Sequence, residues 1–458
     1  MRKVVVLFCL SAGIGLAARL GKMSAEQAFV VSIFSASILG TLLFWDFRLA
    51  FVFTGSGLLL LTHSVDVRHF IEFASLDVII FLIGMMIVVG MMKESGFFHL
   101  LVMKLLMMKN LSGAQLFIII MILSASLSGL TGEVTSIIVM TAAILDISDL
   151  LDINPVPLVI SSVLTTNIGS ASTLLGNPIG ILIALRGNLT FEDFLTRAMP
   201  LSAVVLAVVI LLLCFWYRKY LRDITSKLAL LGREKQRVHN ITFDLSKICS
   251  IALFCLMIAL IAMHRRLEIL FGVRENELLV ILPVIFAGLS LICFHDRALR
   301  CIEREVEWKS LLFFMFLFAQ AGVVQSSGIA QLLAEKLVLQ IGSHPKVLSG
   351  VTLFSSGILS GILDNTVVVA SYIPVVKNLH FVHSTLYPLW WAMLFGACFG
   401  GNITAIGSTA NIVALGVLEK EKNIKINFVE WLKLGSLVGL VSMIIAYLAL
   451  LSVPFFAK

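Results

Sequence analysis

The chain has 458 residues, of which 59% are apolar and only 13% charged, and its mean hydropathy is +1.04. Ordinary soluble domains have about 45–50% apolar and about 25% charged residues. Apolar runs that approach the roughly 20 residues of a membrane span recur along the whole chain. They cover residues 4–18, 28–45, 78–92, 201–216, 248–263, 278–294 and 311–324. The composition excludes a soluble enzyme and predicts an all-α polytopic membrane protein.

The net charge of +7 informs topology and does not indicate nucleic-acid binding. Between Arg218 and Lys247 lie eight Lys/Arg against three Asp/Glu, which predicts that this polar linker is cytoplasmic. The first apolar run follows Arg2 and Lys3 but lacks a small-residue cleavage site, so it is expected to be a retained helix. We therefore predict an integral protein of the inner or plasma membrane, with a cytoplasmic N-terminus and an external C-terminus.

In chain order, the pattern predicts eleven spans and two re-entrant hairpins. The spans are expected near 4–20, 26–45, 47–64, 76–92, 155–187, 194–217, 248–264, 277–294, 309–327, 384–418 and 431–456, and the hairpins at 112–147 and 346–378. Residues 1–25 form an extra N-terminal helix in this scheme. A first repeat covers 26–217, the basic linker 218–247, and a second repeat 248–458.

The repeats rest on internal similarity. Residues 90–105 read GMMKESGFFHLLVMKL, and residues 322–337 read GVVQSSGIAQLLAEKL, with Gly, Ser-Gly, Leu-Leu and Lys-Leu in register. Five full spans separate the copies if each hairpin returns to its own side. Because five is odd, the copies should have opposite orientation, an arrangement many secondary transporters use. A plain bundle of twelve or thirteen spans with parallel halves is the alternative.

Four polar segments interrupt the apolar pattern in two matching pairs. The hairpin tips lie near residues 128–135 and 360–366, and the breaks in two spans near 165–178 and 400–411. A break leaves backbone groups unpaired at a cost of several kcal/mol each in hydrocarbon, unless protein, water or a ligand replaces the lost partners. Unwound carbonyls can bind a cation, and half-helix N-termini attract an anion. The paired breaks favour an ion site between the halves.

Two tip residues, Glu133 and Asp364, are acidic. A carboxylate in the membrane is costly and suits a group that takes up and releases H⁺ or Na⁺. The alternative is that each acid only caps the N-terminus of its half-helix. The sequence leaves both readings open.

Other chemistries lack their motifs. There is no HExxH, no GxSxG elbow, no CxxC pair and no GxxxxGK[ST] loop, so zinc chemistry, a serine hydrolase and ATP-driven transport by this chain alone are disfavoured. No cofactor is expected beyond a coupling Na⁺ or H⁺. An accessory ATPase stays open as a partner, and nucleic acid is not expected.

The second break carries a specific resemblance. Residues 400–416, GGNITAIGSTANIVALG, resemble the GGN-x-T-x-IG-x-[ST]-AN-[VI] signature of the ion transporter superfamily, in its branch of arsenite permeases, pink-eyed-dilution-type proteins and citrate-transporter-like permeases. Asp364-Asn365-Thr366 is similar to the Asp-Asn-x-Thr tip of that group, and residues 167–178 to its first break. The resemblance covers the chain from about residue 26 onward.

The resemblance implies a scaffold, a mobile transport part and homodimerisation through the scaffold. It implies two half-sites for substrate and coupling ion, to which the first hairpin tip adds Glu133 and Thr135. The first half-site has Asn167, Ser170, Thr173, Gly176, Asn177 and Pro178; the second has Asp364, Asn365, Thr366, Asn402, Thr404, Gly407, Ser408, Thr409 and Asn411. A Na⁺ site at the tips and breaks would draw on Asp364, Asn365 and Asn402.

The chain also departs from the superfamily pattern. The first tip has Gly132-Glu133-Val134-Thr135 where relatives usually carry Asn or Asp-Asn before the Thr, and neither tip has the Ser-Asn-Thr of dicarboxylate transporters. We predict a secondary active transporter, coupled to H⁺ or Na⁺, that moves a small oxyanion or carboxylate by alternating access. A Na⁺/H⁺ antiporter is the alternative. A membrane-embedded enzyme is disfavoured, because the polar residues are divided between the halves and are mostly neutral.

Overall fold

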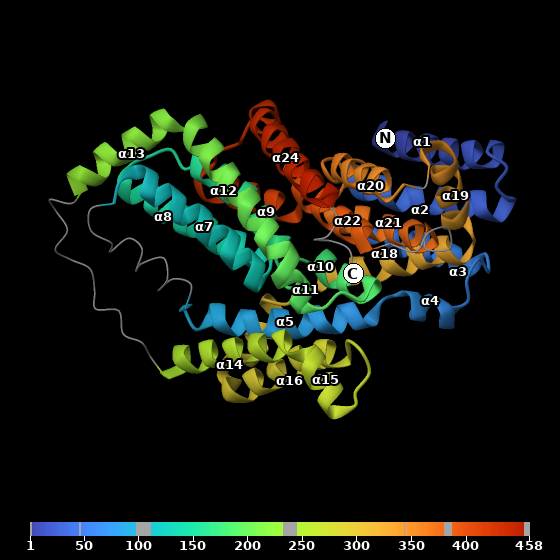
Figure 1. Cartoon of the computed structure of the whole chain (residues 1–458), viewed down its shortest axis with the longest axis horizontal. Helices are drawn as coiled ribbons and strands as arrows, with labels where there is room; N and C mark the ends of the chain where they lie inside the picture. The colour runs from blue at the N-terminus through green and yellow to red at the C-terminus, as the bar shows by residue number, and fades with distance from the viewer. Residues whose placement is uncertain are drawn as a thin grey trace.

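The computed structural model describes residues 2–44, 47–97, 111–231, 245–342, 344–379 and 387–452. Every regular element in these ranges is helical (Figure 1). The N-terminal half contains α1 (Arg2–Leu20), α2 (Ala25–Leu43), α3 (Arg48–Leu61), α4 (Val67–Phe73), α5 (Leu76–Glu94), α7 (Gly113–Thr131), α8 (Glu133–Leu151), α9 (Val156–Ser170), α10 (Pro178–Gly187), α11 (Phe191–Asp193), the π-helical turn η2 (Phe194–Ala198), α12 (Met199–Trp216) and α13 (Arg218–Leu231).

The C-terminal half continues the all-α pattern. It contains α14 (Leu245–Ala262), α15 (His264–Phe271), α16 (Glu277–Cys293), α17 (His295–Arg304), α18 (Trp308–Ser326), α19 (Ile329–Ile341), α20 (Pro345–Ser360), α21 (Asn365–Leu379), α22 (Tyr387–Gly400), α23 (Thr409–Lys422) and α24 (Phe428–Leu451). Residues 232–244 of the predicted linker and the first residues of the predicted span 384–418 lie outside the described ranges.

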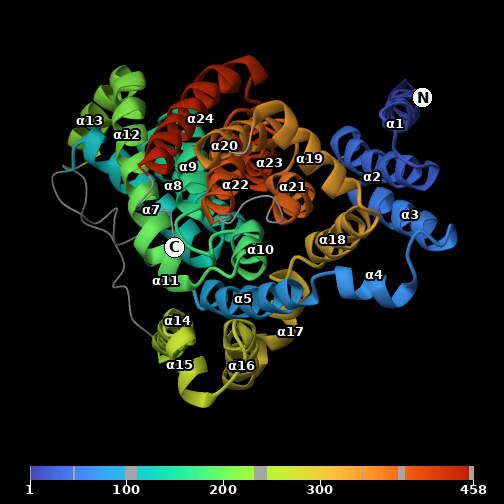
Figure 2. The same cartoon turned by 45° about the vertical axis from the view of Figure 1, so that its right-hand side comes forward.

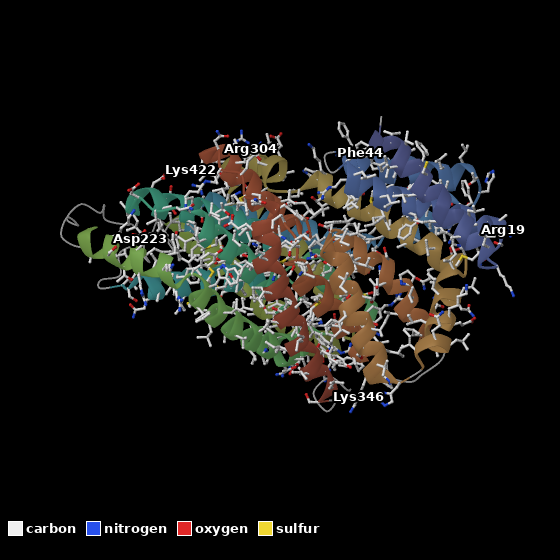
Figure 3. All side chains as sticks on the ribbon, turned by 90° about the horizontal axis from the view of Figure 1, so that it is seen from above. Arg19, Phe44, Asp223, Arg304, Lys346 and Lys422 are labelled. Atoms are coloured by element: carbon white, nitrogen blue, oxygen red, sulfur yellow. The ribbon has the colours of Figure 1, made fainter. Side chains whose placement is uncertain are left out.

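The helices confirm a polytopic membrane protein. Within the described residues, eight helices are long and apolar enough to cross a membrane, or nine if the bent pair 247–262 and 264–271 forms one span. Several apolar helices, such as α3, α9, α10 and α16, are too short to pass that test alone. The number eleven therefore stays a prediction. Figure 3 shows charged residues such as Arg19, Asp223 and Lys346 at the periphery of the helical body.

The two halves repeat one packing pattern. Helix α7 packs on α9, which packs on α12; in the second half α20 packs on α22, which packs on α24. The halves also contact each other crosswise, since α23 packs on α8 and α10 packs on α21. In Figures 1 and 2, α1–α3 and α14–α16 lie at two edges of the molecule, and α5 runs between α14–α16 and the rest. The opposite membrane orientation of the halves stays a prediction.

Glycine allows the close packing inside each half. A Cβ at Gly169 on α9 would overlap the backbone of Ala125 on α7. A Cβ at Gly400 on α22 would overlap the backbone of Gly357 on α20 in the same way. Small residues at such crossings let membrane helices approach backbone to backbone. Equivalent close contacts therefore occur in both halves.

The first hairpin differs from its expected form in one respect. Its arms α7 and α8 have 19 residues each and are separated only at Gly132, whose φ is 92°. The polar tip was expected to leave two short arms. Because a single glycine makes the turn, the helix resumes at once at Glu133. The second hairpin has shorter arms, of 16 residues in α20 and 15 in α21.

Candidate functional site

Each hairpin tip is bound to the break of the neighbouring helix. In the first half, the Thr173 hydroxyl donates to the carbonyl of Gly129, and the backbone N–H of Glu133 donates to Gly176 O at 2.9 Å. In the second half, the Thr404 hydroxyl donates to Gly361 O at 2.5 Å. The two threonines thus hold tip and break together by equivalent bonds.

The helices resume after each break through side-chain caps. Asn177 Oδ1 accepts from Gly180 N at 2.7 Å at the start of α10, where Pro178 occupies the first turn. Ser408 Oγ accepts from Ala410 N at 3.2 Å at the start of α23. Such N-termini carry free N–H groups and partial positive charge. Two of them, one from each half, begin at the breaks.

An amide network joins the two halves between the breaks. Asn167 Nδ2 donates to Asn402 Oδ1 and to Asn411 Oδ1, both at 2.8 Å. All three side chains are fully buried. Asn411 Nδ2 in turn donates to the carbonyls of Gly401 and Thr404, each at 2.8 Å. These bonds replace partners that the break removes from the helix, as buried polar groups require.

The second tip is fully bonded. Asp364 Oδ1 accepts from Thr366 N at 2.9 Å, and Asp364 Oδ2 accepts from the Thr409 hydroxyl at 2.7 Å. With its amide oriented to donate, the Asn365 side chain reaches Gly407 O at 2.8 Å and Ala397 O at 3.1 Å. Asp364 therefore caps the first turn of α21 and ties it to α23, which is the capping role that the sequence had left open.

Glu133 has different surroundings. It is the first residue of α8, yet its side chain makes no cap bond, it is only 6% exposed, and Oε2 has no hydrogen-bond partner among the described residues. The Ser170 hydroxyl lies beside it. A buried carboxyl group of this kind is costly unless it is neutral or bound by a cation. Glu133 makes no cap hydrogen bond, but it lies in the first turn of α8, so its role as a coupling or capping group stays a prediction.

The tips and breaks converge on one cavity, here called the central cavity. It is lined from the hairpins and breaks by Thr131, Gly132, Glu133, Val134, Thr135, Leu175, Asn177, Pro178, Thr366 and Thr409, and from α5 and the α17–α18 region by Leu82, Met85, Met86, Glu305, Glu307, Ser310 and Phe314. It therefore lies where the paired hairpins and breaks meet the remaining helices. No Lys or Arg is among these lining residues.

The other two acids of the cavity wall have partners. Glu305 pairs with Lys93 at 2.7 Å, and Glu307 accepts from the Ser310 hydroxyl at 3.0 Å. Arg48 donates to the same hydroxyl at 3.0 Å. Glu133 has no ion pair within the described part of the chain. Among the three lining acids, Glu133 is the one with neither an ion pair nor a hydrogen bond at Oε2 in the described residues.

The predicted site residues divide into a wall and a support. Glu133, Thr135, Asn177, Pro178, Thr366 and Thr409 line the cavity. The others stand behind it or hold the breaks, namely Asn167, Ser170, Thr173, Gly176, Asp364, Asn365, Asn402, Thr404, Gly407, Ser408 and Asn411. The candidate Na⁺ ligands already make hydrogen bonds within the protein through their side chains; they are Asp364, Asn365 and Asn402. Their role in Na⁺ binding stays a prediction.

Sequence reasoning missed the wall supplied by the α17–α18 region. Glu305 and Glu307 stand just before α18, a position typical of a solvated loop. It also missed Cys398 of α22, whose sulfur accepts from Asn177 Nδ2 at 3.1 Å across the halves. The only sequence signal for this part of the wall was that Glu305 and Glu307 lie so close to the apolar run 311–324.

Comparison with known proteins agrees with this architecture. Residues 47–396 match the CitMHS family, described as citrate transporter. An uncharacterized transporter of Mycobacterium tuberculosis is 32% identical over 377 residues, which cover 81% of this chain and 84% of the relative. The human P protein is 26% identical over 443 residues, covering 81% of this chain and 52% of that protein.

A solved structure shares the fold. The YdaH transporter of Alcanivorax borkumensis, whose crystal structure was described as revealing an unusual topology, aligns with a TM-score of 0.54. The alignment covers 87% of this chain and 90% of that one at 16% sequence identity. The family match and the similarity to the P protein confirm the predicted resemblance to the citrate-transporter-like and pink-eyed-dilution-type branch.

Proposed function

Because the chain belongs to the citrate transporter family, we propose that it is a secondary active transporter that moves a small anion by alternating access, coupled to H⁺ or Na⁺. One observation carries the proposal: both hairpin tips and both breaks, from halves far apart in sequence, wall a single cavity that contains a buried, unpaired carboxyl group. Sites of this construction are typical of secondary transporters.

Glu133 is the proposed coupling group. Its charge has no protein partner, so the cavity favours either a proton on the carboxyl or a Na⁺ beside it. Binding of that ion neutralises the wall, and a negatively charged solute can then enter without repulsion from Glu133. Binding of the coupling ion and of the anion would in this way depend on each other.

The half-helices are the proposed anion contacts. α10 and α23 begin at the breaks, with Pro178 and Thr409 on the cavity wall. Their N-terminal N–H groups favour a carboxylate or oxyanion. Asn177 and Thr366 add uncharged polar groups to the same wall. The relatives' transporter names support no narrower substrate class.

One observation favours a second candidate, Na⁺/H⁺ antiport. The central cavity is lined by three acids, Glu133, Glu305 and Glu307, and by no basic residue among the described ones. Such a wall suits a cation as cargo as well as a coupling ion.

Further parts of the proposal concern assembly and location. We propose an inner or plasma membrane protein that forms a homodimer through its scaffold helices, with the basic linker cytoplasmic, the N-terminus inside and the C-terminus outside. It would need no cofactor and carry out no chemistry on its cargo.

Reconstituted vesicles test the proposal. With radiolabelled citrate, phosphate or arsenite inside or outside, an imposed Na⁺ or pH gradient should drive anion uptake by the wild type, and Glu133→Gln should abolish the dependence on that gradient. Na⁺ movement driven by a pH jump in the absence of any anion would select the antiporter. Full gradient dependence in Glu133→Gln would remove Glu133 from the coupling step.

A further inference from the structure

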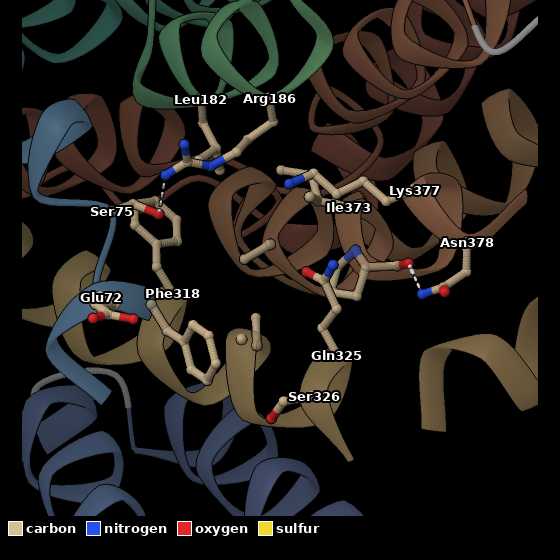
Figure 4. Close-up of a pocket in the computed structure, with 15 residues that line it drawn as sticks. Glu72, Ser75, Leu182, Arg186, Phe318, Gln325, Ser326, Ile373, Lys377 and Asn378 are labelled. Carbon is tan, nitrogen blue, oxygen red and sulfur yellow. Dashed lines mark hydrogen bonds between the residues drawn. The ribbon is translucent and has the colours of Figure 1, made fainter. Parts of the chain in front are cut away.

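A second, larger cavity is lined by several of the same helices as the central cavity, among them α10, α18 and α21. It has a volume of about 510 Å³ against about 70 Å³ for the central cavity. It is lined by Glu72, Phe73 and Ser75 before α5, Leu182 and Arg186 of α10, Phe318, Ala321, Gly322, Gln325 and Ser326 of α18, and Ala370, Ile373, Pro374, Lys377 and Asn378 of α21 (Figure 4). We call it the basic cavity.

The two cavities follow each other along the same helices. On α18 the central cavity reaches Ser310 and Phe314, and the basic cavity begins one turn later at Phe318. On α21 the step is from Thr366 to Ala370, again one turn. α10 also contributes to both cavities in the same order. The basic cavity therefore adjoins the central cavity, and we also call it the vestibule.

The vestibule lies at the end of the molecule away from the linker. Arg186 is five positions before α11, from which α12 runs 18 residues to the start of the basic linker. That helix is about 27 Å long at 1.5 Å per residue. With the linker in the cytoplasm, the vestibule opens toward the external side.

The charges of the vestibule are unbalanced. The Arg186 guanidinium is bound by both oxygens of Asp77, at 3.0 and 3.1 Å, and by the Ser75 hydroxyl at 2.7 Å. Lys377 is half-buried and has no hydrogen bond or ion pair among the described residues. Figure 4 shows its side chain reaching from α21 toward Arg186.

These contacts leave one positive charge in a partly buried, polar pocket. The remaining acid of the wall, Glu72, pairs with Arg68 on the outer surface. A half-buried ammonium without a partner beside a second cation favours a bound anion. Gln325, Ser326 and Asn378 add neutral hydrogen-bonding groups to the same wall. The volume lies within the range of small-ligand sites.

We propose that the basic cavity is an external capture site for a small carboxylate or oxyanion, held by Lys377 beside the Arg186–Asp77 pair before it moves to the central cavity. This inference rests on the proposed anion transport and adds a second site to it. The two cavities would then have different roles because their charges differ. The basic vestibule attracts the anion, and the acidic central cavity admits the anion only together with its coupling ion.

Charged thiol reagents test the site without knowledge of the substrate. In a Ser326→Cys variant, modification rates are measured with the anionic sulfonatoethyl methanethiosulfonate and with its cationic trimethylammonium analogue. The ratio of the anionic to the cationic rate should be higher at position 326 than at an exposed cysteine elsewhere on the same protein. Modification at this position is read by peptide mass spectrometry, because the chain has seven cysteines of its own. Added Lys377→Gln should lower the anion-to-cation rate ratio about fivefold, and Lys377→Arg should keep it.

Lys420→Gln serves as the matched control, since Lys420 is exposed at the far end of α23 and does not line the cavity. Citrate at millimolar concentration should slow the modification of the vestibule that carries Lys377 but not of the Lys377→Gln variant.

A rate ratio insensitive to Lys377→Gln would overturn the proposal even if the vesicles transport citrate. A sensitive ratio with no anion transport would instead overturn the proposed function and leave the basic site standing. Protection by anionic lipid vesicles but not by citrate or sulfate would assign the site to lipid headgroups and overturn capture of cargo.

Discussion

Glu133 and Asp364 occupy equivalent tips but have different surroundings. Asp364 accepts two hydrogen bonds, from Thr366 N and the Thr409 hydroxyl, while Glu133 Oε2 accepts none. Both are buried. An unpaired buried carboxyl group lowers stability, whereas a bonded one contributes to it. The two acids should therefore respond oppositely to neutral substitution.

We predict that Glu133→Gln leaves the melting temperature unchanged or raises it. Asp364→Ala should lower the free energy of unfolding by about 1–3 kcal/mol, because it removes a cap and leaves the Thr409 hydroxyl unpaired. Thermal denaturation in detergent at fixed pH measures both. Equal losses in the two variants would mean that Glu133 has a structural bond after all. Asp146→Ala, at an exposed position within α8, is a control with little expected effect.

At the scale of the elements, glycine contacts bring a hairpin arm and a broken helix together in each half. Gly400 meets the backbone of Gly357, and Gly169 meets that of Ala125. A methyl group at either place requires the helices to separate. The breaks they support would then move relative to the tips.

We expect Gly400→Ala to cost about 1–3 kcal/mol of stability, as overpacking of a filled interior does. Gly169→Ala should behave alike in the other half. Gly416→Ala on α23 is the matched control, because a Cβ there has no atom within 4 Å. Denaturation in detergent and transport in vesicles are both measured. An unaffected Gly400→Ala would show that the α20–α22 contact is not tight.

At the scale of the whole molecule, both cavities lie between the paired hairpins and breaks on one side and α5 with α18 on the other. Alternating access requires these two parts to move against each other. A bond across the vestibule should therefore stop transport, while a bond inside one part should not.

The chain offers a pair of residues for each case. Gln325 of α18 and Asn378 of α21 line the vestibule from the two different parts, and Figure 4 shows both side chains. Ser64 and Ser326 line a separate cavity between the loop before α4 and α18, within one part. With cysteines at both positions, a bifunctional thiol reagent should stop transport in the first pair and spare it in the second. Transport that continues through a quantitatively linked Gln325→Cys/Asn378→Cys pair would contradict relative movement of the two parts.

Much of this organisation follows from local sequence. Apolar length predicts the helices, Gly132 and the polar breaks predict where helices stop, and the repeated Thr173 and Thr404 predict that the breaks are equivalent. These are short-range properties, since helix formation and its interruption depend on neighbouring residues. The family resemblance is equally local, because it rests on contiguous motifs.

Long-range contacts decided the rest. The sequence could not distinguish the bonded Asp364 from Glu133, whose Oε2 has no hydrogen-bond partner among the described residues. Thr409, which donates to Asp364, and Ser170, which lies beside Glu133, come from other helices. Nor could it bring Lys377 beside Arg186, which lie on α21 and α10 in different halves. Charge in a low-dielectric interior depends on which groups approach through space. The sequence by itself therefore determined an all-helical transporter with paired breaks, and only the tertiary structure decided which of the described charged side chains have protein partners.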